Sequence, residues 1–177
     1  MPLEELLVCR DSQGAAGRLI VGIADMKIAS PPAELIVTHA LGSCIGLTAY
    51  DPTTRVGGML HFMLPAPTAG SEVDNPARYG MTGIPALFRA LYAKGANKQN
   101  LIVCAAGGSR MLGNGSEDTR IGERNHLILR KLLWKNGIQL SAEDTGGTHS
   151  RTMTLHLATG EVIISNAGTK EQLYPAA

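Results

Sequence analysis

The chain has 177 residues, of which 44% are hydrophobic and 18% charged, and its formal net charge is +1. These values are typical of a single soluble domain and exclude general disorder. Because nucleic acids and anionic membranes require clustered positive charge, the absence of any long Lys/Arg run argues against both as the main partner.

The N-terminal segment lacks the features of a targeting sequence. Glu4 and Glu5 stand where a signal peptide carries basic residues, and no stretch reaches the ~20 apolar residues of a membrane helix. We therefore expect a cytoplasmic protein without membrane insertion. Residues 1–17 are expected to form a flexible leader, 18–170 a single domain and 171–177 a tail.

The first half of the chain is rich in strand patterns. Strands are predicted at residues 19–29, 33–40, 44–50 and 56–64. The sequence DPTTR between the last two indicates a hairpin with Pro52 at its first central position. Residues 66–80 are polar and rich in Pro and Gly, and they predict a long surface loop.

The second half contains two predicted helices. One begins at Met81 and ends at Gly95, and the other spans residues 126–137. Strands are predicted at 101–106, 138–144, 151–158 and 161–166, with an irregular Gly-rich segment from residue 107. Because the strands come mostly in runs, the order favours an α+β fold: a layered sandwich of mostly antiparallel or mixed sheet with two main helices.

The three cysteines are Cys9, Cys44 and Cys104, an odd number without a CxxC pair, which supports neither a disulfide framework nor a zinc ribbon. Cys44 follows a tight Gly42-Ser43 turn that a buried structural cysteine does not need. Its other interpretation is an ordinary core residue.

The predicted hairpin brings a base toward this cysteine. If Pro52 and Thr53 are its central residues, Cys44 lies directly opposite His61, with Cβ atoms ~5 Å apart. A one-residue slip would separate the two side chains, and a two-residue slip would make them diagonal neighbours on one face. An imidazole beside a thiol can take its proton and then protonate a leaving group. A satisfied interior histidine is the alternative for His61.

The turn before Cys44 can contribute backbone donors. N–H groups of the Gly42-Ser43-Cys44 turn, above all those of Gly42 and Ser43, are predicted to bind an oxyanion, with Gly42 in a left-handed conformation. The imidazole also needs an orienting partner, for which Thr38, Asp51 and His39 remain candidates.

Several motifs resemble the CheD family of chemoreceptor glutamine deamidases. They are THALGSC at 38–44, an Asp-Pro turn, GGMLHFMLP at 57–65, Arg78-Tyr79, Gly107-Gly108 with Met111, IGERN at 121–125, and DTGGTHSRTMTLHLATGEV at 144–162. The resemblance spans roughly residues 18 to 165. Its most specific part is T-x₃-GSC followed by H-x-MLP.

The resemblance implies a Cys–His–Thr triad formed by Cys44, His61 and Thr38. It also implies a sandwich fold similar to the catalytic domain of the cytotoxic necrotizing factor deamidases, and hydrolysis of receptor glutamines to glutamate through a thioester, without a metal or other cofactor. Some members also hydrolyse glutamyl methyl esters, and several bind the phosphatase CheC. The chain departs from the family at 103–111, where Val103 or Cys104 replaces a lysine and Ser109 an alanine.

A glutamine on a receptor coiled coil is presented on a convex surface, so loops 66–80 and 107–120 are candidates for docking it. Asn75, Arg78 and Tyr79 are the predicted docking residues, and an ordinary loop is the alternative.

Other functions fit part of the pattern. A cysteine peptidase or transglutaminase-like enzyme would use the same nucleophile and base, and a zinc site could use His39, Cys44 and His61. A non-catalytic adaptor that binds CheC or the receptor is the best non-enzyme alternative.

Overall fold

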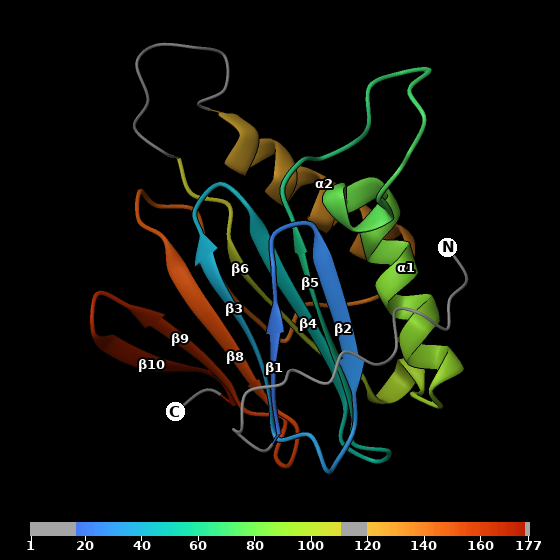
Figure 1. Cartoon of the computed structure of the whole chain (residues 1–177), viewed down its shortest axis with the longest axis vertical. Coiled ribbons are helices and arrows are strands. Elements are labelled where there is room, and N and C mark those ends of the chain that lie inside the picture. Colours follow the sequence, from blue (N-terminus) through green and yellow to red (C-terminus); the bar gives the residue numbers. More distant parts are fainter. Residues whose placement is uncertain (1–16, 111–119, 176–177) are drawn as a thin grey trace.

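The computed structural model of the chain describes residues 17–110 and 120–175. Most of the predicted leader, part of the Gly-rich loop 107–120 and the last two residues of the predicted tail lie outside the described residues. In the described part, the chain forms two five-stranded sheets and two α-helices (Figure 1).

The first sheet has the strand order β1-β3-β8-β9-β10 and the second the order β2-β5-β4-β6-β7. The first contains β1 (Arg18–Val21), β3 (Leu35–Leu41), β8 (Arg151–His156), β9 (Val162–Asn166) and β10 (Thr169–Tyr174). The second contains β2 (Asp25–Ala29), β5 (Val56–Phe62), β4 (Ile45–Asp51), β6 (Ile102–Gly107) and β7 (Ala142–Thr145). Both are mixed, because β1 runs parallel to β3 and β6 parallel to β7.

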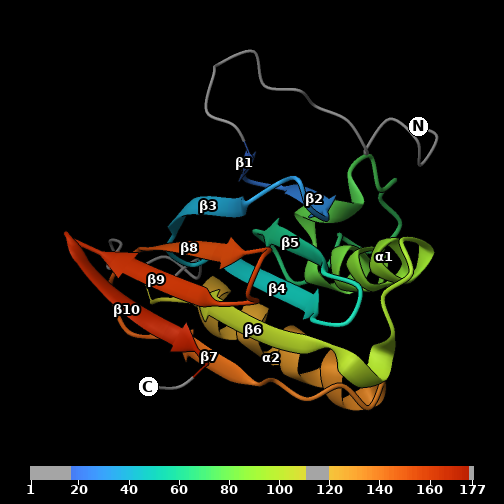
Figure 2. The same cartoon turned by 90° about the horizontal axis from the view of Figure 1, so that it is seen from below.

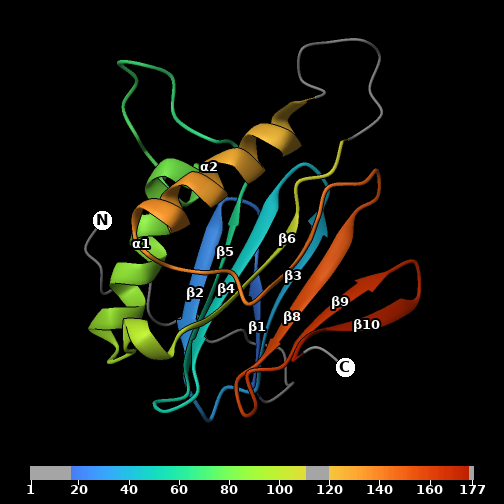
Figure 3. The same ribbon diagram turned by 180° about the vertical axis from the view of Figure 1, so that it is seen from behind.

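The molecule has three layers. The two sheets pack face to face, and α1 (Gly80–Ala93) and α2 (Ile121–Lys135) cover the outer face of the second sheet (Figures 2 and 3). Short 3₁₀ turns at Pro76–Arg78 and Lys98–Asn100 flank α1. The predicted α+β sandwich with two helices is confirmed. No helix among residues 17–110 and 120–175 is long and apolar enough to span a membrane.

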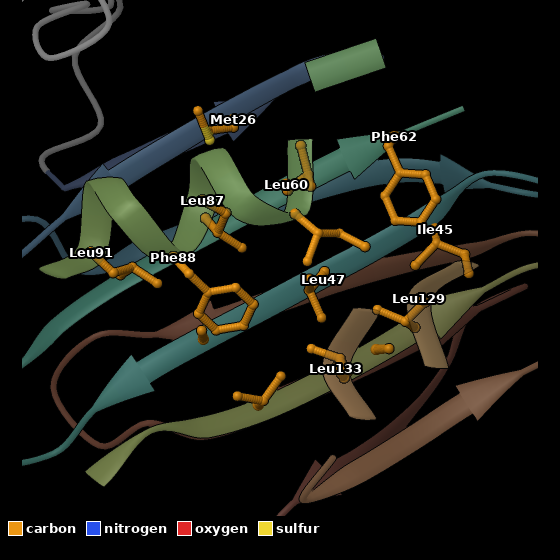
Figure 4. Close-up of a cluster of buried hydrophobic side chains, with 14 of the residues drawn as sticks. Met26, Ile45, Leu47, Leu60, Phe62, Leu87, Phe88, Leu91, Leu129 and Leu133 are labelled. Carbon is orange, nitrogen blue, oxygen red and sulfur yellow. The ribbon is translucent and has the colours of Figure 1, made fainter. Parts of the chain in front are cut away.

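Each interface between layers has its own apolar core. Between the second sheet and the helices, alternate residues of β4 and β5 such as Leu47 and Leu60 meet Leu87 of α1 and Leu129 of α2 (Figure 4). Residues of the opposite parity face the first sheet, where Met59 packs in the second core. Successive side chains of β4 and β5 therefore point alternately toward the helices and into the space between the sheets.

Some elements differ from the prediction, among them the strand expected at 138–144, which is shorter in the structure and forms β7 at Ala142–Thr145. The single strand expected at 19–29 is two strands in different sheets, because the chain turns at residues 22–24 with Ala24 at φ 57°. Helix α2 begins at Ile121 rather than residue 126. Strand β10 was not predicted, because its sequence TKEQLY is largely exposed and has no apolar alternation.

The register of the β4–β5 hairpin was also predicted wrongly, by two residues. Asp51 pairs with Val56, so the connection is the four-residue loop 52–55 rather than a two-residue turn. The Asp51 Oδ1 accepts hydrogen bonds from the Thr53 and Thr54 N–H groups, and Arg55 closes the loop at φ 56°. His61 consequently lies opposite Gly46 instead of Cys44.

Candidate active site

Cys44 lies directly before β4, at the end of the sandwich from which the 66–75 loop projects (Figure 1). It precedes Gly46 by two residues, so it is a diagonal neighbour of His61 and shares its face. The side chain is half-buried and packs against the core between the sheets. Burial raises the pKa of the Cys44 thiol, an effect that its own backbone N–H partly opposes. The raised pKa favours the thiol form of Cys44 at rest.

His61 is fully buried between the two sheets and contacts Thr38 of the opposite sheet. The Thr38 Oγ1 lies 2.8 Å from the His61 Nδ1 and 2.7 Å from the Val21 carbonyl oxygen. Since a carbonyl can only accept, the Thr38 hydroxyl donates to Val21 and accepts from the imidazole. The proton of neutral His61 is therefore on Nδ1, and Nε2 carries the lone pair.

The Nε2 atom of His61 is buried and has no hydrogen-bond partner among the described residues. Burial lowers the pKa of His61 from 6.5 to about 4, although Asp25 on the adjacent strand β2 acts in the opposite direction. At neutral pH the imidazole is uncharged, which is the state that a general base requires.

The other two candidates for orienting His61 lie elsewhere. Asp51 is at the opposite end of β4, where its carboxylate binds the backbone N–H groups of its own loop and of Asn97. His39 is exposed and contacts the Thr152 hydroxyl through Nδ1. It is therefore not directed into the space between the sheets, and the residues of the alternative zinc site, His39, Cys44 and His61, do not come together.

Two residues that directly follow β6 bind the backbone of the loop that carries Cys44. The Gly108 N–H donates to the Cys44 carbonyl at 2.8 Å, and the Ser109 N–H donates to the Gly42 carbonyl at 2.8 Å. Gly107, at φ 106°, has no room for a side chain, because a Cβ there would collide with the Cys44 carbonyl oxygen. The Gly107-Gly108 pair thus allows close approach of two backbones.

The expectation of a left-handed Gly42 was wrong. The positive φ, 58°, belongs to Ala40, and the Gly42 N–H donates to the Ala40 carbonyl at 2.9 Å. This bond removes the Gly42 N–H from the possible oxyanion donors. Within residues 17–110 and 120–175, the N–H groups of Ser43 and Cys44 have no such acceptor.

The predicted docking residues flank α1. Asn75 uses its side chain within the fold: Oδ1 accepts from the Ala77 N–H and Nδ2 donates to the Ala24 carbonyl. Arg78 and Tyr79 are half-buried, and the Arg78 carbonyl accepts from the N–H of Met63, immediately after β5. Their role in docking stays a prediction.

Three buried polar residues near the site were not assigned roles from the sequence. Arg151 binds Asp144 through two hydrogen bonds of 2.8 and 2.9 Å and donates to the Ser109 hydroxyl at 2.7 Å. This network gives the buried Ser109 hydroxyl a charged donor, and the same hydroxyl donates to the Gly146 and His149 carbonyls. Asn125 donates to the Ser43 carbonyl. Both Gly122 and Asn125 belong to the motif IGERN. A Cβ at Gly122 would meet the backbone of Gly108 and Ser109, and Asn125 binds the Ser43 carbonyl, so the motif marked residues next to the site.

These features define an α+β sandwich protein in which a half-buried cysteine is the diagonal neighbour of a threonine-bound histidine. Sequence comparison gives the family. The sequence model of the CheD family, described as CheD chemotactic sensory transduction, matches residues 63–166. The chain belongs to the CheD family.

The comparison includes proteins from distant organisms. The chain is 44% identical over 163 residues to a Solibacter usitatus protein named "Probable chemoreceptor glutamine deamidase CheD", covering 90% of this chain and 95% of that one. It is 46% identical over 148 residues to an Anaeromyxobacter dehalogenans relative, "Probable chemoreceptor glutamine deamidase CheD 2", covering 82% and 92%. A Pyrococcus horikoshii protein with the first of these names is 43% identical over 143 residues, covering 80% and 88%.

Proposed function

We propose that this protein deamidates glutamine side chains of chemoreceptors to glutamate, with Cys44 as nucleophile, His61 as general acid and base, and Thr38 as the group that orients His61. The observation that carries the proposal is the direction of the Thr38 hydrogen bonds. They fix the tautomer of His61 that leaves Nε2 free to accept a proton, on the face that also carries the half-exposed Cys44. The family membership and the names of the relatives supply the substrate class.

The first half of the reaction forms a thioester. His61 Nε2 takes the proton of the Cys44 thiol as the sulfur attacks the amide carbon of the glutamine side chain. A C–S bond forms, and the electron pair of the carbonyl moves onto its oxygen. When the carbonyl reforms, the C–N bond breaks and ammonia leaves with the proton from His61. The raised pKa of Cys44 and the lowered pKa of His61 favour proton transfer during attack over a permanent ion pair.

The second half consumes water. His61, again neutral, takes a proton from a water molecule that attacks the thioester carbon, and the C–S bond breaks to give glutamate and the Cys44 thiol. Each step uses groups of the chain and water, so the mechanism needs no metal or organic cofactor. The same chemistry on a glutamyl methyl ester would release methanol, which makes methylesterase activity a natural second reaction.

Two further expectations come from the family resemblance. They are binding of a CheC-like regulator and similarity to the catalytic domain of the cytotoxic necrotizing factor deamidases. The competing function is a non-catalytic adaptor, and a peptidase or transglutaminase-like enzyme would share the nucleophile. Each would give a different product.

The test is incubation of the purified protein with a chemoreceptor cytoplasmic fragment, followed by mass spectrometry of the receptor peptides and an ammonia assay. We expect the mass increase of amide-to-acid conversion at specific glutamines, together with released ammonia, and neither with Cys44→Ala. A cut chain or a cross-link would identify one of the other enzymes. Receptor binding without any modification would identify the adaptor.

A further inference from the structure

Asn125 of α2 joins the two segments that carry the candidate nucleophile and base. Its side chain is fully buried, and Nδ2 donates to the Ser43 carbonyl at 2.9 Å and to the Met63 carbonyl at 3.0 Å. Both partners are acceptors, so the amide nitrogen must face them, and both of its hydrogens are used. Ser43 directly precedes Cys44, and Met63 follows His61 by two residues.

The Ser43 carbonyl also determines where the Cys44 N–H points. In a trans peptide the C=O and N–H of one unit point in opposite directions. Since Asn125 holds the Ser43 C=O on the α2 side, the Cys44 N–H is turned away from that helix. The Ser109 N–H binds the Gly42 carbonyl in the same manner. The Ser43 N–H, which belongs to the same peptide unit as that carbonyl, therefore points away from Ser109.

The Ser43 and Cys44 N–H groups form no hydrogen bond within the part of the chain that the structure describes. The Cys44 N–H also lies near enough to its own sulfur to oppose the rise of the thiol pKa. Unused N–H donors on successive residues beside a nucleophile are suited to bind the negative charge of an oxyanion.

We propose that Asn125 is a positioning residue that holds the Ser43–Cys44 peptide so that the Ser43 and Cys44 N–H groups form the oxyanion hole. The inference rests on the proposed function and deepens it, because it removes Gly42 from the expected oxyanion donors and names the residue that holds the Ser43 and Cys44 donors in place. Asn125 does not touch the reacting atoms. It fixes the peptide that does.

Two reactions of Cys44 separate this role from general damage to the site. Acylation by p-nitrophenyl acetate proceeds through an oxyanion, because the thiolate adds to a carbonyl carbon before p-nitrophenolate leaves. Alkylation by iodoacetamide forms a C–S bond at a saturated carbon with loss of iodide and no oxyanion. A misplaced peptide should therefore slow acylation selectively, whereas a damaged thiol or base should slow both reactions.

The test compares Asn125→Ala with Asn136→Ala in a Cys9→Ser background, with labelling mapped to Cys44. Asn136 is a matched control, since its Nδ2 also donates to a backbone carbonyl, that of Leu132, at the other end of α2. We expect Asn125→Ala to lower the acylation rate roughly 10- to 100-fold and to change the alkylation rate less than about twofold. Asn136→Ala should change neither rate.

Equal loss of both reactions in Asn125→Ala, or loss of neither, would overturn the inference. If this variant does not fold, amide NMR of the wild-type protein decides: when Cys44 forms a hemithioacetal with a peptide aldehyde, the Ser43 and Cys44 amide resonances should move downfield. Unmoved resonances would reject the hole. Neither readout uses a receptor, so failure of the proposed function would show separately as absence of glutamine deamidation.

Discussion

Replacing Thr38 with valine removes one hydroxyl from the centre of the site and nearly preserves the shape of the side chain. The hydroxyl accepts from the His61 Nδ1–H at 2.8 Å and donates to the Val21 carbonyl at 2.7 Å, and both groups are buried. Each unsatisfied buried polar group costs about 1–3 kcal/mol, so the two together should lower the free energy of unfolding by about 2–6 kcal/mol. Without an acceptor at Nδ1, His61 no longer prefers the tautomer that leaves Nε2 free. Deamidation should therefore fall by a factor within the ~10²–10⁴ that general acid–base catalysis supplies.

Thr48→Val is the matched control for this prediction. Thr48 is also buried between the sheets, and its hydroxyl donates to the Cys104 carbonyl at 3.3 Å without contacting a histidine. The Thr48→Val variant should lose about 1 kcal/mol in the free energy of unfolding and little deamidation activity. Thr38→Ser keeps the hydroxyl and should keep most of the activity. Urea unfolding and ammonia release from a receptor fragment measure the two effects. Equal activity of the two valine variants would refute the orienting role of Thr38.

The remaining predictions concern stability and the loop of Cys44. Gly107→Ala should lower the free energy of unfolding by at least about 3 kcal/mol, because the residue has a positive φ and its Cβ would collide with the Cys44 carbonyl. Gly146→Ala also has a positive φ but lies in open space, so it should cost about 1 kcal/mol. Equal losses in urea unfolding would show that the Cβ at residue 107 does not collide with the Cys44 carbonyl. Arg151→Met removes a buried guanidinium and leaves the Ser109 hydroxyl and the Asp144 carboxylate without it, so the melting temperature of the variant should fall by several degrees. An unchanged melting temperature would show that this network does not stabilise the fold. Because the pKa of His61 is about 4 in the folded chain against 6.5 ordinarily, the unfolded chain binds more protons in this window. The free energy of unfolding of the wild type should therefore fall as the pH drops from 6.5 toward 4, by up to about 3 kcal/mol more than that of His61→Gln. Parallel dependence of stability on pH in the two proteins would contradict the lowered pKa of His61.

The sequence predicted the elements whose apolar periodicity is strong. The strands around Leu47 and Leu60 and the helix containing Leu87 were expected, because each alternates or repeats toward one core. Strand β10 was missed because an exposed strand at the edge of its sheet carries no such period. The division of residues 19–29 between two sheets depends on packing that a local pattern does not encode.

The site was predictable in composition more than in geometry. Cys44 and His61 were placed on one face, which holds in the structure, although the length of the loop after Asp51 changed their pairing from direct to diagonal. Hairpin register depends on turn geometry, and DPTTR is compatible with more than one turn. The IGERN motif drew attention to Asn125 but not to its role, because Asn125 and Arg151 contact Ser43 and Ser109, which are far away in the sequence.

The most direct test of the account is capture of the covalent intermediate. A receptor fragment is mixed with the wild-type protein, quenched with acid at short times and analysed for an adduct between a receptor glutamine and the enzyme. We predict a hydroxylamine-sensitive thioester on Cys44, accompanied by glutamate formation that Cys44→Ala abolishes. Glutamate formed at the wild-type rate by Cys44→Ala, or an adduct mapped to Cys104, would contradict the account.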